Sequence, residues 1–355
     1  MVSLEELLLL LVKKGGSDLH ITAGIPPRIR VDGQLINTEN EPLTSDDTQK
    51  MIYGLLNTNQ ISKFEKELEL DMSFGIESIG RFRTNVFRQR GAVGAVMRLI
   101  PYQIKTFEQL GLPRKTCEDL CNTLKGLVLV TGATGSGKST TLASMIDFIN
   151  TTYKGHILTV EDPVEFLHKH KSCVVNHREV GADTHDFTSA LKRALRQDPD
   201  VVLIGEMRDL ETTEAALTIS ETGHLVFGTL HTSDCVQTIN RIIDIFPAHQ
   251  QQQVRTQLSF TLQAVFAQQL LPKAEGKGRV LASELMIATP AIRANIRDSK
   301  IHQVYSAIQT GGKLGMRTMN QALLDLYKAR QITYDTAMAY TSDPDDLKRI
   351  FEKGQ

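Results

Sequence analysis

A complete phosphate-binding motif at residues 126–141 limits what this chain can fold into. The segment has the sequence GLVLVTGATGSGKSTT, in which the apolar residues 127–130 predict a buried strand. The strand opens into the pattern GxxxxGK[ST], whose glycines let backbone N–H groups point at phosphate oxygens while the lysine contacts the β- and γ-phosphates. We therefore expect an α/β domain that binds a nucleotide through Gly132, Ala133, Thr134, Gly135, Ser136, Gly137, Lys138, Ser139 and Thr140.

Strand and helix patterns alternate along the chain after this motif. Such alternation predicts a parallel sheet covered by helices on both faces, in which ligands bind beyond the carboxyl ends of the strands. The expected strands are 127–131, 156–161, 200–205 and 224–230, and the expected helices are 138–150, 186–197, 210–221 and 235–245.

Acidic side chains and a histidine stand at the ends of these predicted strands. Glu206 follows an apolar strand and resembles a Walker B acid, with Gly205 where the usual Mg²⁺-binding aspartate stands. We expect Ser139 and Glu206 to hold Mg²⁺ beside ATP, Glu206 acting through water. Glu206 and Glu161 are both candidates for the general base, with Glu206 preferred. His231 is a candidate contact for the γ-phosphate, although a strand-end histidine is more often structural.

The composition excludes several classes of protein. The 355 residues carry a formal net charge of −1, which argues against binding to nucleic acid or to an anionic membrane surface. The 4 cysteines form no CxxC pair, so a zinc site is disfavoured and reduced thiols are expected. No apolar run approaches the length of a membrane span, so we expect no direct membrane insertion and a cytoplasmic location.

The first hundred residues predict a separate α+β module. A capped helix at 3–14 is followed by a hairpin near 28–34, and helices at 44–56 and 60–68 precede strands at 72–76 and 80–87. In the last strand, period-two alternation puts Arg81 and Arg83 on one face. Two interpretations stay open: a charged edge strand protected from aggregation, or arginine fingers that reach a neighbour's nucleotide.

Several blocks of the sequence resemble the type II/IV secretion and type IV pilus ATPase superfamily. They are GGSDLHI, RFRTNVFRQ, GATGSGKSTT, ILTVEDPVEF, LRQDPDVVLIGEMRD and TGHLVFGTLHT. The resemblance implies a hexameric ATPase whose subunit has a PAS-like domain at 1–100, a linker at 101–113 and a RecA-like core at 114–290. In that superfamily, arginines of the N-terminal domain reach nucleotide, and the matching positions here are Arg81, Arg83 and Arg88.

Residues 291–298, AIRANIRD, are similar to the AIRNLIRE motif of the pilus-retraction branch, with Ala291, Ile292, Arg293, Ile296 and Arg297 in matching places. The pattern alone fits a small amphipathic surface helix equally well. Assembly and secretion ATPases usually carry a longer N-terminal region and a four-cysteine zinc module, and we expect neither in this protein, whose cysteines cannot build that module. The resemblance therefore implies a motor for pilus retraction and twitching motility, held at the cytoplasmic face of the inner membrane by the pilus platform protein. An assembly or secretion ATPase, a DNA-transfer motor and a nucleotide-binding regulator are the alternatives.

The last hundred residues predict mostly helix. Residues 250–269 are rich in glutamine and place Val254, Leu258, Leu262, Val265 and Phe266 at helical spacing, which favours one packed helix. Residues 316–328 and 332–340 predict further helices in a C-terminal subdomain at 291–355.

Overall fold

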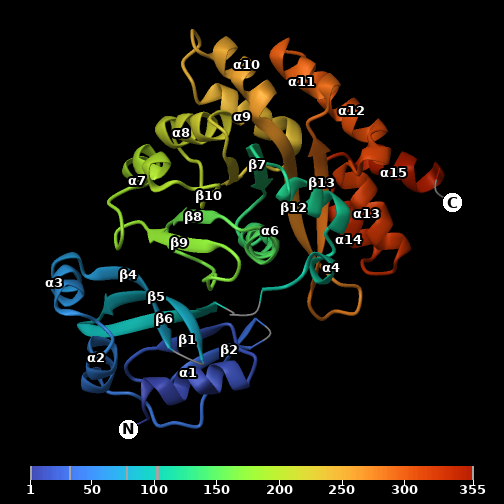
Figure 1. Cartoon of the computed structure of the whole chain (residues 1–355). Helices are drawn as coiled ribbons and strands as arrows, with labels where there is room; N and C mark the ends of the chain where they lie inside the picture. The colour runs from blue at the N-terminus through green and yellow to red at the C-terminus, as the bar shows by residue number, and fades with distance from the viewer. Residues whose placement is uncertain (1, 32, 77–78, 101–103, 354–355) are drawn as a thin grey trace. The chain divides into compact units, whose positions relative to one another are not determined.

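The computed structural model describes residues 2–31, 33–76, 79–100 and 104–353. The fold is α/β, and the chain divides into two compact units, Met1–Gln103 and Ile104–Gln355 (Figure 1). The first unit is built on an antiparallel sheet, and the second on a mostly parallel sheet followed by helices.

The first unit is a six-stranded sheet with three helices, coloured blue to cyan in Figure 1. Its strand order is β3-β2-β1-β6-β5-β4, and the pairings between neighbours are antiparallel. The helices are α1 (Leu4–Lys13), α2 (Ser45–Tyr53) and α3 (Thr58–Glu67). The strands are β1 (Asp18–Ile21), β2 (Arg28–Val31), β3 (Gln34–Asn37), β4 (Glu69–Ile76), β5 (Gly80–Gln89) and β6 (Ala92–Ile100).

The capped first helix predicted from the sequence is confirmed. The Ser3 hydroxyl accepts a hydrogen bond from the Glu6 backbone N–H, and the Glu6 carboxylate accepts one from the Ser3 N–H. These reciprocal bonds satisfy two N–H groups that a helix start otherwise leaves open. Leucines at helical spacing then bury one face of α1 in the core, namely Leu7, Leu8 and Leu11.

The strand that carries Arg81 and Arg83 is not an edge strand, so the edge-strand interpretation is wrong. β5 pairs with β4 on one side and with β6 on the other. The sequence pattern does not predict β6, and without that strand β5 has only β4 as a partner. The predicted alternation does hold: Phe82 and Val86 are buried, and Arg83 on the other face is exposed.

The second unit is a seven-stranded sheet in the order β13-β12-β7-β11-β10-β8-β9. All neighbouring pairs run parallel except β12 and β13, which are antiparallel. The predicted parallel sheet is therefore confirmed apart from its last strand. The strands are β7 (Gly126–Thr131), β8 (His156–Glu161), β9 (Val174–Glu179), β10 (Val201–Ile204), β11 (Leu225–Leu230), β12 (Leu262–Pro272) and β13 (Arg279–Ile287).

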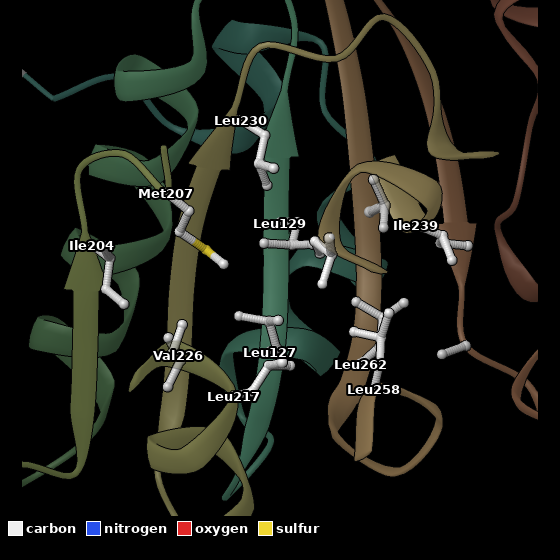
Figure 2. Close-up of a cluster of buried hydrophobic side chains, with 14 of the residues drawn as sticks. Leu127, Leu129, Ile204, Met207, Leu217, Val226, Leu230, Ile239, Leu258 and Leu262 are labelled. Atoms are coloured by element: carbon white, nitrogen blue, oxygen red, sulfur yellow. The ribbon is translucent and has the colours of Figure 1, made fainter. Parts of the chain in front are cut away.

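Helices cover both faces of this sheet. Alternate residues of the buried strand β7 enter two different cores: Leu129 packs with Leu217 and Ile239 on one face (Figure 2), and Val128 packs on the other. The helices that contribute to these cores include α4 (Phe107–Leu110), α5 (Arg114–Cys121), α6 (Lys138–Thr152), α7 (Phe187–Ala194), α8 (Leu210–Glu221), α9 (Cys235–Asp244), α10 (Gln251–Thr261), α11 (Pro290–Arg297) and α12 (Val304–Thr310). A 3-10 turn, η1 (Leu195–Gln197), extends α7.

The expected single helix at residues 250–269 is wrong. The helix α10 ends at Thr261, and the chain continues as β12, which lies between β7 and β13. A strand that is buried on both faces carries apolar residues on both faces. The apolar residues of β12 therefore also fit the spacing of a helical stripe. Val265 and Phe266, which we assigned to the helix, are fully buried in this strand.

The C-terminal region is helical, as expected. It comprises α11 (Pro290–Arg297), η2 (Ile301–Gln303), α12 (Val304–Thr310), η3 (Gly312–Leu314), α13 (Met319–Lys328), α14 (Tyr334–Tyr340) and α15 (Pro344–Lys353). Part of the expected linker, residues 101–103, lies outside the described residues, while Phe107 and Leu112 belong to the core of the second unit. Within the described ranges, every helix is too short or too polar to cross a lipid bilayer.

Candidate active site

The loop between β7 and α6 has a backbone that requires glycine. Gly132, Gly135 and Gly137 have φ angles of +140°, +80° and +94°, in the region that favours glycine. A Cβ atom on Gly132 would lie only 2.4 Å from the carbonyl oxygen of Gln268. The loop conformation therefore depends on these glycines, as the phosphate-binding motif predicts.

The start of α6 is open to an anion. Its N-cap is Gly137, so the helix has no side-chain cap for its first N–H groups. The Lys138 ammonium donates to the carbonyl oxygens of Gly132 at 2.8 Å and Ala133 at 3.1 Å, which holds it over the loop. Burial lowers the pKa of Lys138, and the negative charges of Glu206 and Glu165 oppose that shift.

The sheet order brings the other strand-end residues to the same edge. β7, β11, β10 and β8 are consecutive neighbours and parallel. The loop containing Lys138 follows β7, His231 follows β11, Glu206 follows β10, and Glu161 ends β8. These residues therefore all lie along the carboxyl edge of the sheet, where α/β proteins bind their ligands.

Glu206 is contacted by two basic side chains. Its Oε1 atom lies 2.6 Å from Nε of Arg208 and 3.0 Å from Nε2 of His231. Partial burial acts to raise the pKa of Glu206, but the contacts with Arg208 and His231 outweigh it and hold that pKa below its usual value. Glu206 is thus a fixed carboxylate with little affinity for a proton.

Glu161 is in a different environment. It is 8% exposed, and burial raises the pKa of its carboxyl group to about 7. Gly205 is the reason it fits, since a Cβ atom at that position would lie 3.1 Å from Cα of Glu161. The glycine in place of the usual Walker B aspartate therefore leaves room for a carboxylate from the neighbouring strand.

The arginines predicted to act on nucleotide belong to the first unit. Arg81 contacts the hydroxyl of Ser73, and Arg83 is exposed. Arg88 forms an ion pair with Glu65 at 3.0 Å and lies over the ring of Phe64. The Arg88 side chain is therefore already paired with Glu65 within a single subunit.

The motif at 291–297 combines structural and exposed residues. Ile292 and Ile296 are fully buried. The Arg293 guanidinium donates to the carbonyl oxygens of Ser259, Phe260 and Ala288 and to the side chain of Gln263, at 2.8 to 3.0 Å. Arg293 therefore caps the end of α10. Ala291 and Arg297 are exposed, and Arg297 pairs with Asp298 at 3.6 Å.

Replacing Arg293 with alanine is expected to destabilise the fold. The change removes hydrogen bonds from carbonyl oxygens at a helix end, which costs about 2 kcal/mol in the free energy of unfolding measured with urea. Arg297→Ala is the matched control, because the side chain is exposed and makes one surface ion pair of little value. Equal stability of the two variants would contradict the assignment of Arg293 as a helix cap.

Some residues near the site were not singled out from the sequence. Arg208 is one of them, although it lies in the same block as Glu206. Another is Gln268, whose amide donates to the hydroxyl of Thr141 in α6 at 2.9 Å and so braces the helix behind the phosphate loop. Because the sequence pattern assigned Gln268 to a helix, its contact with Thr141 could not be predicted. The contact follows from the pairing of β12 with β7.

The fold and the glycine loop together define a P-loop nucleotide-binding protein. The family model of the type II/IV secretion system protein matches residues 3–318. The chain belongs to that family.

Individual relatives agree with this assignment. The chain is 50% identical to the type IV pilus retraction ATPase PilT of Pseudomonas aeruginosa, over 98% of the chain and 100% of the relative. It is 43% identical to the type IV pilus ATPase PilU of the same organism, over 99% and 91%. A crystal structure of the pilus retraction motor PilT with bound ADP superimposes with a TM-score of 0.92 at 52% identity, over 98% of this chain and 100% of that one. The expected resemblance to pilus-retraction ATPases is thus confirmed.

Proposed function

We propose that this protein hydrolyses ATP to power retraction of a type IV pilus. The observation that carries the proposal is the presence of Glu161 and Glu206 on the same sheet edge as the Lys138 loop. A P-loop supplies binding of the phosphates, and the acids supply the means to activate a water molecule. The full-length similarity to a pilus retraction ATPase supports retraction as the work performed.

The chemistry follows from the charges of these residues. The N–H groups at the start of α6 and the Lys138 ammonium neutralise the phosphate oxygens. Glu161 orients a water molecule and accepts its proton as the oxygen attacks the γ-phosphorus, and ADP departs on the opposite side. A base works best when its pKa is near the working pH, which favours Glu161 over Glu206.

Ser139 and Glu206 are the side chains suited to Mg²⁺. Mg²⁺ prefers oxygen ligands and is usually bound by one or two protein groups together with water and substrate phosphates. In the part of the chain that the structure describes, His, Cys, Asp and Glu side chains form no group of three or more that could hold a metal ion. This fits a cation that enters with ATP and neutralises charge on its phosphates.

The remaining site residues would act between subunits of a homohexamer. Arg81 and Arg83 share one face of β5, so a closing first unit would present them to a neighbour's ATP as a pair, whereas Arg88, on the opposite face, would have to leave Glu65 to take part. Arginine supplied in this way stabilises the charge of the transition state. Loss of the γ-phosphate would then release the unit, which gives a motion coupled to hydrolysis. His231, beside Glu206, is placed to respond to that change.

The hexamer would act at the cytoplasmic face of the inner membrane through the pilus platform protein. The near-neutral charge of the chain favours a protein partner over nucleic acid. Within the motif at 291–297, Arg297 and Ala291 are the exposed members and are the candidates for that contact.

A motility assay on cells that lack this gene tests the proposal. We expect surplus surface pili and no twitching, with recovery from a plasmid carrying the wild type but not Lys138→Ala. Loss of pili would instead indicate an assembly motor, and loss of DNA uptake or transfer with normal twitching would indicate a DNA-transfer motor.

A further inference from the structure

We propose that Thr159 and His177 are positioning residues that orient the Glu161 carboxylate through a line of hydrogen bonds across β8 and β9. The inference rests on the proposed role of Glu161 in ATP hydrolysis and adds two residues to it. The line is built from side chains on one face of the sheet and from the segment 162–168 that follows β8.

The register of the strands places these residues side by side. Thr159 of β8 lies opposite His177 of β9, and Glu161 lies opposite Glu179. Because side chains two residues apart share a face, all four belong to the same face of the sheet. Across it, Thr159 Oγ1 is 2.8 Å from His177 Nδ1, and Glu161 Oε1 is 3.9 Å from the same nitrogen.

The direction of the hydrogen bonds follows from their fixed donors. The backbone N–H of His168 donates to Nε2 of His177 at 3.1 Å, so Nε2 is an acceptor and a neutral ring carries its proton on Nδ1. That N–H donates to the Thr159 hydroxyl oxygen. In the proposed line, the Thr159 O–H donates to Glu161, which lies two residues along the same face of β8. This agrees with the way that burial raises the pKa of Glu161 and Thr159 opposes that rise.

Backbone N–H groups of the segment 162–168, which follows β8, bind the side chains of Glu161, Glu179 and His177. The N–H of Glu165 donates to Oε2 of Glu161 at 3.3 Å, and the N–H of Val164 donates to Oε2 of Glu179 at 3.1 Å. Together with the bond from His168, three backbone groups of one segment bind three side chains of one face. The orientation of Glu161 is therefore set from both sides.

The residues of this line are buried, which makes their hydrogen bonds more effective in holding Glu161. Thr159 is fully buried, and the side chain of His177 is 14% exposed. A hydroxyl in such a place is costly unless it is hydrogen-bonded, and its bonds hold their partners firmly because water does not compete. The arrangement suits a carboxylate that must point at one water molecule with little freedom to turn.

The test compares Thr159→Val with Thr159→Ser in the full chain. Valine has the shape of threonine without the hydroxyl, whereas serine keeps the hydroxyl. The groups facing Glu161 are His177, Glu165 and Glu179, and none of them is changed. Without the donated bond, Glu161 is protonated up to a higher pH. We expect kcat for ATP at pH 7 to fall about fivefold in Thr159→Val, and the acidic limb of kcat to move up by about one pH unit.

The KM for ATP is expected to stay within about twofold of wild type, because Thr159 does not contact nucleotide. Thr159→Ser should restore most of kcat and return the acidic limb of the pH profile to its wild-type position. Thr261→Val is the matched control for buried volume, since that hydroxyl donates to the carbonyl oxygen of Gln257 within α10. It should leave the pH profile unchanged.

The outcomes separate this inference from the proposed function. A wild-type protein without ATPase activity would overturn the proposed function and this inference with it. An active wild type whose pH profile is unchanged in Thr159→Val would overturn the inference alone, as would an equal loss of kcat at every pH. If Thr159→Val fails to fold, His177→Phe keeps the buried ring and removes both nitrogens, and it should move the limb in the same direction.

Discussion

Glu161→Gln is expected to lower kcat for ATP hydrolysis by about 10³-fold while ATP still binds. Glutamine has the same shape but accepts no proton, so water is no longer activated. Because burial raises the pKa of Glu161 to about 7, the wild-type rate should rise with pH through that value as the carboxylate ionises. The measurement is steady-state ATP turnover between pH 6 and 9, with nucleotide binding measured on the same samples.

Glu206→Gln is the control that decides which acid is the base. Its carboxylate is bound by Arg208 and His231, so its loss should weaken hydrolysis and leave the rise near pH 7 in place. If the rise of the rate near pH 7 instead vanished in Glu206→Gln and persisted in Glu161→Gln, the base would be Glu206, which the strand-end pattern of the sequence favours.

The second large effect is expected from mixed subunits. Arg83→Ala and Lys138→Ala should each abolish most ATPase activity alone, because in the proposed hexamer the first removes a charge from the neighbour's site and the second removes a charge from its own. In a hexamer assembled from equal amounts of both, a site that joins an intact lysine loop to an intact Arg83 forms in about a quarter of the interfaces. We therefore expect recovery of up to about a quarter of the wild-type rate.

The assay is ATP turnover after mixing the two variants under conditions that allow subunits to exchange. Each variant mixed with itself is the control and should stay inactive. No recovery in the mixture, with an active wild type, would show that arginine and lysine serve the same subunit or that Arg83 has no part in hydrolysis.

The sequence predicted the nucleotide-binding half of the fold because local and global signals agree there. Buried apolar strands are followed by glycine, acid or histidine, and three of the helices, α7, α8 and α9, are capped by Asp186, Asp209 and Asp234. Where a pattern fits two structures, prediction failed: the apolar run of β12 matches a helix and a buried strand equally. Strands β6, β9 and β13 were not predicted either, although each pairs with the strand that precedes it in the chain.

The residues of the candidate site could be predicted from the sequence, but the different roles proposed for Glu161 and Glu206 could not. Strand-end acids identified Glu161 and Glu206, and Arg208, two residues after Glu206, is a local difference between them. The rest of the difference arises from neighbours on other segments: His231 also contacts Glu206, and the close approach of Gly205 encloses Glu161. Arg293 is a similar case, because its cap on α10 depends on a contact with residues 259 and 260.

The most direct test is a crystal structure of Glu161→Gln with ATP and Mg²⁺, since that variant should bind ATP without consuming it. We predict the β- and γ-phosphates on the loop from Gly132 to Ser139 with the Lys138 ammonium turned toward them, and residues 161 and 206 facing the γ-phosphate. A triphosphate bound elsewhere, or one whose γ-phosphate is far from both positions, would contradict the account.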